Sequence, residues 1–201
     1  MGRALYSILE WITRFAYLNV LWIFFTLTGG IVVGLFPATV AMFSVIRQWL
    51  KGKSDQPVFH TFWQLYKQEF RKSNRLGIII YLISFIFIFN LFFLQANIGE
   101  LLIWTSAPLL GGMLLFILIL FYLFPAYAHF DLPVFQLIRN AFLTMLVSPL
   151  HTLFIILGLG GFYLLATVIP ALAVVFGASF YSFITMWVAL DAFQRIHKKN
   201  A

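Results

Sequence analysis

Long uninterrupted runs of apolar residues are the feature that most constrains the fold of this chain. Most of them approach or exceed the roughly 20 residues that a helix needs to cross a bilayer. The runs are continuous rather than alternating, and open strands are excluded because in lipid they leave backbone hydrogen bonds unsatisfied. The runs occupy Phe15–Phe36, Ala38–Leu50, Leu76–Leu94, Leu101–Phe124, Leu150–Ile169 and Ala171–Ala189.

The composition points to lipid as the solvent. Hydrophobic residues make up 63% of the chain and charged residues only 9%, whereas a soluble domain has about a quarter charged residues. A water-soluble protein of this size could not wet its exterior with so few polar groups. The sequence therefore predicts an all-α, polytopic membrane helix bundle, with six transmembrane helices and amphipathic helices on the cytoplasmic face. Residues 1–201 are expected to form a single membrane domain.

The basic residues are distributed on one side of this layout. If all six runs cross, the N-terminus, the loop 47–75, the segment 125–140 and the C-terminus share a side, and every Lys and Arg lies there. The turns on the other side carry Glu100 as their only charge. The positive-inside rule then predicts that both termini are cytoplasmic. These cations are Arg3, Arg14, Arg47, Lys51, Lys53, Lys67, Arg71, Lys72, Arg75, Arg139, Arg195, Lys198 and Lys199.

The net charge of +7 would suggest a nucleic-acid partner in a soluble protein. Here the cations flank apolar runs, so the predicted partner is the lipid bilayer with its anionic headgroups, and no nucleic acid is expected.

The run Ala38–Leu50 is shorter than the others and could either cross the membrane or form a re-entrant loop. At 1.5 Å per residue it covers about 20 Å. A re-entrant loop would place the most basic stretch of the chain outside, so a true crossing is favoured. In this layout Arg47 reaches the inner interface, and the outer turn lies at Pro37.

Three helices are expected to lie at the cytoplasmic interface, at about 3–14, 56–74 and 132–148. In the second, the aromatic residues recur at helical spacing and form a stripe, with cations on other faces. Asp55 is the expected N-cap and Pro57 is tolerated in the first turn. Two interpretations remain open, anchoring in the headgroup layer or docking of a partner. The residues concerned are Phe59, Phe62, Trp63, Tyr66 and Phe70 with Lys67 and Arg71.

A short motif occurs twice. The sequence Pro57-Val58-Phe59 recurs as Pro133-Val134-Phe135, 76 residues later. Each copy has the same predicted order of an inward span, a capped cytoplasmic helix and an outward span. The second helix has lost most of its charge and keeps Arg139.

Few residues in the chain could carry chemistry. The polar residues expected within the membrane are Asn19, Asn90 and His151. They could line a solute path, or form helix–helix hydrogen bonds and an interfacial histidine. The chain has no cysteine, no metal-binding histidine pair and no phosphate-binding glycine loop. No catalytic, cofactor or metal site is predicted, and the protein is not expected to be an enzyme.

Several stretches resemble the YesL-like family of bacterial integral membrane proteins, a family of unknown function. They are "NVLWIFFTLTGGIVVGLFPATVAMFSVIRQWL" (19–50), "FHTFWQLYKQEF" (59–70) and "PAYAHFDLPVFQLIRNAFLTMLVSPLHTL" (125–153). The motifs are short, but they occur in the same order over most of the chain. Members of the family often accompany carbohydrate-use systems and sugar importers of the ATP-binding cassette (ABC) type. The resemblance thus implies a role near glycan uptake in the bacterial cell membrane, and it supplies no catalytic residue.

Two functions follow as predictions. The first is an accessory or scaffold protein, associated with a carbohydrate ABC importer or with further copies of itself, that docks partners through its cytoplasmic amphipathic helices. The alternative is a small solute transporter or channel, which the internal repeat favours. A polar cavity at Asn90 would favour transport, and a dry, close-packed bundle would favour the scaffold.

Overall fold

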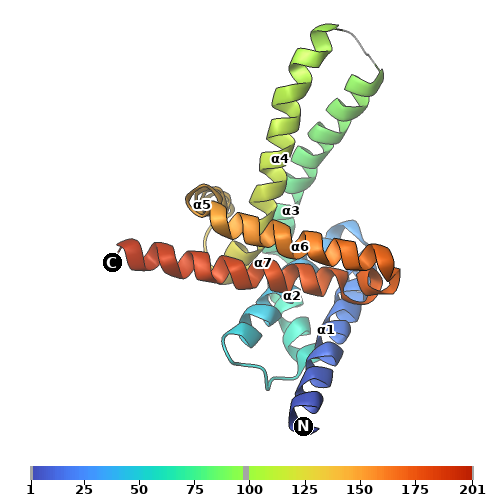
Figure 1. The fold of residues 1–201 in the computed structure, drawn as a ribbon, viewed down its shortest axis with the longest axis vertical. Helices are drawn as coiled ribbons and strands as arrows, with labels where there is room; N and C mark the ends of the chain where they lie inside the picture. The colour runs from blue at the N-terminus through green and yellow to red at the C-terminus, as the bar shows by residue number, and fades with distance from the viewer. Residues whose placement is uncertain (1, 97–99, 201) are drawn as a thin grey trace.

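The computed structural model describes residues 2–96 and 100–200, and over these residues the chain forms helices joined by short turns and loops, with no strand (Figure 1). Six of the helices are long and apolar enough to cross a membrane. The predicted all-α membrane fold is therefore confirmed. The helices are α1 (Gly2–Thr28), α2 (Val32–Leu50), α3 (Val58–Ala96), α4 (Glu100–His129), α5 (Val134–Val147), α6 (Pro149–Val168) and α7 (Pro170–Asn200).

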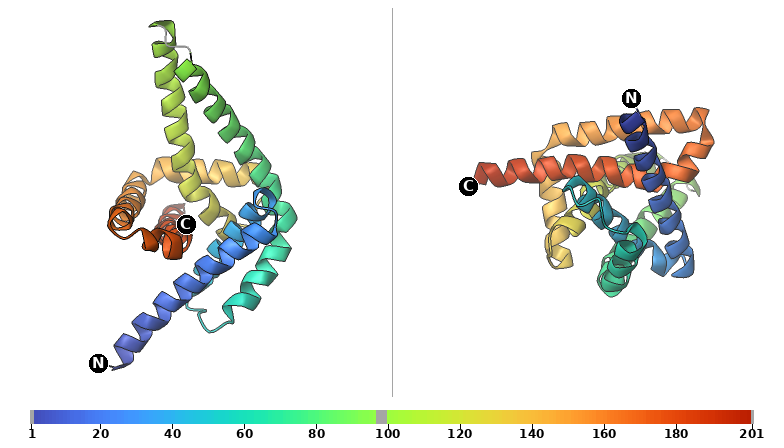
Figure 2. Two further views of the ribbon diagram at one scale, coloured as in Figure 1. Left: turned by 90° about the vertical axis from the view of Figure 1, so that its right-hand side faces the viewer. Right: turned by 90° about the horizontal axis from the view of Figure 1, so that it is seen from below.

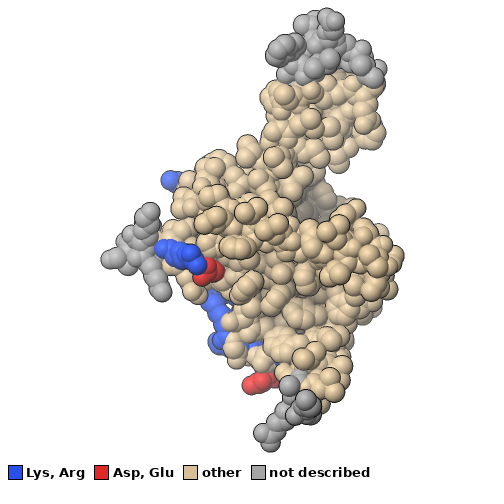
Figure 3. Space-filling model, in the orientation of Figure 1, with Lys and Arg blue, Asp and Glu red and all other residues tan. Residues whose placement is uncertain are grey.

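Two helical hairpins cross each other. The hairpin of α3 and α4 extends from the body of the molecule. The hairpin of α6 and α7 lies across the place where the α3–α4 hairpin leaves this body (Figures 1 and 2). The start of α1, the end of α7 and the loop 51–57 lie on the lower and left sides of Figure 1, whereas the end of α3, the start of α4 and the α6–α7 turn lie at the top and right. The visible Lys and Arg side chains gather on the same lower and left sides, and the described part of the projecting hairpin shows no charge (Figure 3).

Helix α2 is the centre of the fold. It packs against α1, α3, α4 and α7. Of the residues in its most apolar 18-residue stretch, 61% are buried, which is the largest share among the six long helices. It contributes to both hydrophobic clusters, through Phe43 and Ile46 in one and Phe36 and Val40 in the other. The shortest apolar run of the sequence is thus the most enclosed helix, because its small residues let neighbouring helices approach closely.

The turn between the first two spans differs from the expected one at Pro37. It lies at Gly29–Ile31, and Pro37 is inside α2. Gly30 has φ of 80° and Ile31 φ of 55°, a region that glycine enters without steric cost. A side chain on Gly29 would collide with Gly34 and with the hydroxyl of Tyr66, so the tight turn requires glycine there. The long apolar run Phe15–Phe36 concealed this turn.

Two predicted interfacial helices also merge with their neighbours. Residues 3–14 are the first part of α1, and residues 56–74 and 76–94 form one continuous helix, α3. Between these segments no proline removes a backbone donor, so nothing ends the helix. The third, expected at 132–148, is the separate helix α5. Asp55 lies three residues before Val58, and its carboxylate accepts a hydrogen bond from Ser54 at 3.4 Å, so Asp55 is not the N-cap residue of α3.

Candidate functional site

The aromatic stripe of α3 is a contact surface within the chain. The rings of Phe59, Phe62, Trp63 and Tyr66 surround Phe25 of α1, with ring centroids 5.0 to 6.2 Å from it. Phe62 and Tyr66 are buried, and the Tyr66 hydroxyl donates to the Phe25 carbonyl at 3.2 Å. The structure therefore places the middle of the predicted docking stripe in the α1–α3 contact, where no partner could reach it.

The edges of the stripe remain accessible. Phe59 and Trp63 are 48% and 37% exposed, and Lys67 and Arg71 are exposed beside them. The Lys67 ammonium lies 4.8 Å from the Trp63 ring centroid, a favourable cation–π distance. Phe70 is partly buried against Tyr66. Of the seven residues predicted for an interface, these four exposed ones form a continuous cationic and aromatic rim.

A polar seam joins α3 and α4 on the charged side. The Tyr127 hydroxyl donates to Glu69 at 2.8 Å, and the Lys72 ammonium donates to Asp131 at 2.5 Å. Lys72 also lies 5.5 Å from the Tyr127 ring centroid. The nearby ammonium holds the pKa of the Asp131 carboxyl below its usual value, by hydrogen bonding and by charge. Asp131, which lies two residues before the second copy of the Pro-Val-Phe motif, thus joins that copy to the helix of the first.

The charged end of α2 contacts the same seam. The Arg47 guanidinium donates to the Ala128 carbonyl of α4 at 2.8 Å. Partial burial lowers the pKa of Lys51, and the positive charges of Arg47 and Lys53 lower it further. Three helices therefore meet where the basic residues gather.

Asn19 forms a clamp between α1 and α7. Its side-chain nitrogen donates to the Val174 carbonyl at 2.8 Å, and its oxygen accepts from the backbone N–H groups of Ala178 and Ser179 at 3.1 and 3.2 Å. The side chain is 2% exposed. One amide thus hydrogen-bonds both a carbonyl and two N–H groups of α7, within residues 174–179, which is the helix–helix interpretation of this residue.

Asn90 lies elsewhere and has a different role. Its side chain donates to the Ile86 carbonyl within α3 at 2.8 Å. It is partly exposed on the projecting hairpin, where no described cavity includes it. Asn19 therefore joins two helices, whereas Asn90 bonds only within its own helix, and the two side chains do not line a shared path.

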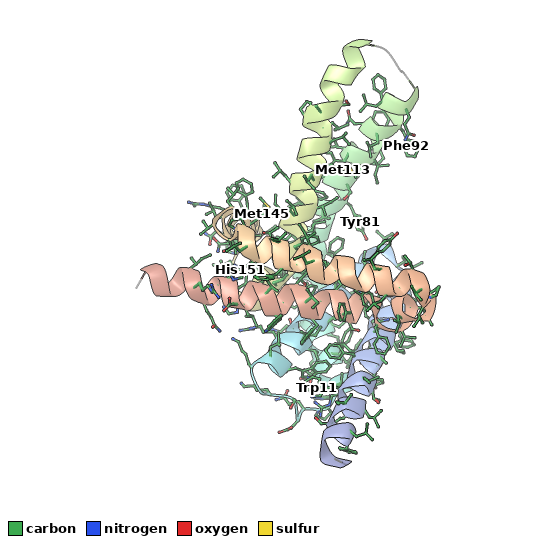
Figure 4. The ribbon with its side chains drawn as sticks, viewed as in Figure 1. Trp11, Tyr81, Phe92, Met113, Met145 and His151 are labelled. Atoms are coloured by element: carbon green, nitrogen blue, oxygen red, sulfur yellow. The ribbon has the colours of Figure 1, made fainter. Side chains whose placement is uncertain are left out.

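His151 lies in a groove between α6 and α7. Its ring nitrogen Nε2 is 2.9 Å from Asp191, and the same carboxylate oxygen accepts from Arg195 at 2.9 Å. The groove has a volume of about 1080 Å³, and its other walls are mostly apolar. In Figure 4, His151 lies toward the end of α6 that adjoins α5, beside α7.

The sequence did not identify the partners of His151. Asp191 and Arg195 are four residues apart on α7 and form an ion pair that helical spacing could have suggested. Their contact with His151, 40 residues earlier in the chain, depends on the packing of α6 against α7. Among residues whose side chains are described, no group of three or more His, Asp or Glu could hold a metal ion.

Six membrane-length helices around a largely apolar interior define the class of this molecule, which is a polytopic helical membrane protein. The chain belongs to the family described as "Protein of unknown function, DUF624", whose model matches residues 15–91. This confirms the expected YesL-like family.

Relatives in Bacillus subtilis (strain 168) extend the similarity to nearly the whole chain. The chain is 38% identical to the uncharacterized protein YesV over 198 residues, covering 98% of this chain and 95% of the relative. It is 35% identical to YteU, covering 98% and 88%, and 33% identical to YesL, covering 94% and 90%. No solved structure matches the chain.

Proposed function

We propose that the protein is an accessory or scaffold subunit of the bacterial cell membrane, with both termini in the cytoplasm and no catalysis of its own. The observation that carries the proposal is the combination of a buried, apolar interior with Lys and Arg side chains that gather on the lower and left sides of the face shown in Figure 3. In such a molecule, the side chains that bind a partner lie on the surface.

The interior favours this function over transport. A solute path needs polar groups that face a shared cavity. Asn19 is instead occupied by the backbone of α7, and Asn90 by its own helix. The serine and threonine side chains buried along α7 are used similarly, with Ser182 donating to the Met42 sulfur at 3.1 Å and Thr185 to the Tyr181 carbonyl at 2.7 Å.

The proposed docking surface is the rim formed by Phe59, Trp63, Lys67 and Arg71. Exposed aromatic and arginine side chains are the types that contribute most to protein–protein binding. The buried members of the stripe hold α3 on α1 and thereby fix the position of this rim. The family resemblance makes subunits of a carbohydrate ABC importer the partner to test first.

The test is co-purification of the tagged full-length protein from native membranes, after crosslinking. Importer subunits should accompany the protein, and Lys67→Glu should reduce their yield severalfold. The matched control is Arg139→Glu, which reverses an exposed cation on α5 and should leave the yield unchanged. Equal losses for both variants, or absence of importer subunits, would contradict the proposal. Sugar flux into liposomes containing only this protein would support the transporter alternative instead.

A further inference from the structure

The groove between α6 and α7 combines two kinds of surface. Its apolar walls include Phe154, Leu157 and Trp187, which are 62%, 61% and 59% exposed. Its polar residues are His151, Asp191 and Arg195. The apolar walls belong to segments long enough to span a membrane. A ligand that fits both parts has an apolar chain and a polar head.

The polar end is organised around one carboxylate. Asp191 accepts from His151 and from the Arg195 Nε through the same oxygen, Oδ2. The His151 side chain is 13% exposed and the Arg195 side chain 71%. The ion pair orients the guanidinium, while its two terminal nitrogens make no hydrogen bond within the described residues. Such an edge can bind a phosphate through two parallel hydrogen bonds.

The second oxygen of Asp191 makes no hydrogen bond to the described residues either. It can accept a hydrogen bond from a hydroxyl group next to the phosphate. The groove therefore presents a phosphate-binding donor beside a hydroxyl-binding acceptor. The sequence continues with Lys198 and Lys199, and cations near a membrane surface attract anionic lipids.

We propose that this groove binds one anionic phospholipid whose headgroup carries hydroxyl groups, of the phosphatidylglycerol type. The phosphate binds Arg195, a headgroup hydroxyl donates to Asp191, and an acyl chain lies along Phe154, Leu157 and Trp187. His151 is a positioning residue, because it acts by holding Asp191. This site is separate from the docking rim on α3.

Trp187 provides the readout. Phosphatidylglycerol with brominated acyl chains quenches tryptophan fluorescence on contact. The fluorescence of Trp187 is obtained by subtracting the fluorescence of the Trp187→Phe variant from that of the wild-type protein. In mixed micelles, brominated phosphatidylglycerol should quench this signal at a lower lipid fraction than brominated phosphatidylcholine, whose headgroup lacks a hydroxyl donor. Equal quenching by the two lipids would overturn the proposal.

Charge removal supplies the second arm. Loss of one cation at a membrane surface changes lipid affinity by about fivefold, so Arg195→Gln should lower the preference for phosphatidylglycerol by about that factor. Arg139→Gln removes an exposed cation of α5 outside the groove and should keep the preference. An unchanged preference in Arg195→Gln would overturn the assignment, and so would displacement of the lipid by soluble glycerol phosphate.

Discussion

The two copies of the Pro-Val-Phe motif introduce helices of different length. Helix α3 begins at Val58 and α5 at Val134, which preserves the 76-residue spacing of the sequence. Helix α3 then continues for 39 residues, whereas α5 ends after 14 and α6 begins directly afterwards. The same local start is therefore followed by one unbroken helix in the first copy and by two helices in the second.

A single position accounts for the difference. The break in the second copy lies at Ser148–Pro149, and the corresponding residues of the first copy are Lys72 and Ser73. Pro149 disfavours the helical conformation at the residue before it, and Ser148 has φ of −123° and ψ of 58°. Ser73 is fully buried inside α3. One proline therefore decides whether the cytoplasmic helix is separate from the span or continuous with it.

The surroundings of the two helices differ as well. The start of α3 is covered by Phe25 of α1, so Phe62 is buried. The start of α5 packs against α4 instead, with Leu137 buried. Phe135 is nevertheless 80% exposed although it matches Phe59, which is 48% exposed. The first aromatic residue of the helix is therefore partly covered by a neighbouring helix in the first copy and largely uncovered in the second.

The largest expected effect comes from giving the first copy the break of the second. Ser73→Pro places proline in the interior of α3 and should destabilise the fold by about 3 kcal/mol or more. Thermal unfolding in detergent, followed by size-exclusion chromatography, measures it. The control Pro149→Ala changes the first position of α6, where proline is already well tolerated, and should cost much less. Similar melting of Ser73→Pro and the wild type would contradict the explanation of the break.

The second-largest effect on stability should come from glycines, which are packed closely in the first copy and not in the second. A methyl group at Gly77 would collide with the Phe36 ring of α2, while one at Gly160 of α6 would meet nothing within 4 Å. Gly77→Ala should therefore cost about 1–3 kcal/mol by overpacking. Gly160→Ala should be neutral or stabilising, because alanine favours helix by up to about 1 kcal/mol. The two thermal midpoints give the comparison, and a more harmful Gly160→Ala would refute it.

The asparagines provide a smaller contrast. Asn19→Leu removes three hydrogen bonds to α7, and interhelical bonds in membranes contribute about 1 kcal/mol in total or somewhat more. Asn90→Leu removes only a bond within α3 and should change stability by less than about 0.5 kcal/mol. Denaturation of the two variants in the same detergent tests this. Equal effects would mean that the clamp does not hold α7.

The smallest effect concerns the link between the copies, the Lys72–Asp131 ion pair. The pKa of Asp131 is lowered in the folded protein, so the pair stabilises the fold above the unfolded carboxyl pKa of about 4. This stabilisation is lost as the pH falls through the lower folded value. Asp131→Asn should melt slightly below the wild type at pH 6 and converge with it near pH 3. Because both side chains are accessible to solvent, added salt should shrink the difference. A gap that widens toward low pH would contradict this sign.

The sequence predicted the number and rough position of the long helices because continuous apolar runs have few alternatives in lipid. Helix ends were less accessible to prediction. The turn at Gly29–Ile31 lies within an apolar run, and only the close approach of Gly29 to Gly34 reveals why it occurs there. Helix α3 continues through Lys72 and Ser73 because the first copy has no proline at the position of Pro149. Only a comparison of the two copies could predict this continuity from the sequence.

The candidate sites were predictable only in part. The helical spacing of the aromatic residues of α3 indicated a contact stripe, but it could not show that Phe25 of α1 covers the stripe. Asn19 was identified as a polar residue in a span, and its partners on α7 are some 155 residues away. His151 was identified as interfacial, whereas Asp191 and Arg195 became its neighbours through tertiary packing.

The side of the membrane that each segment faces decides both the six-span layout and the position of the docking rim. The chain contains no cysteine, so single substitutions give clean labelling sites for a membrane-impermeant thiol reagent on intact cells. Lys53→Cys and Arg71→Cys should react only after the membrane is permeabilised. Ile31→Cys, at an exposed position of the α1–α2 turn that already carries a side chain, should react without permeabilisation. Labelling of Lys53→Cys or Arg71→Cys on intact cells would contradict the six-span layout and the cytoplasmic position of the docking rim.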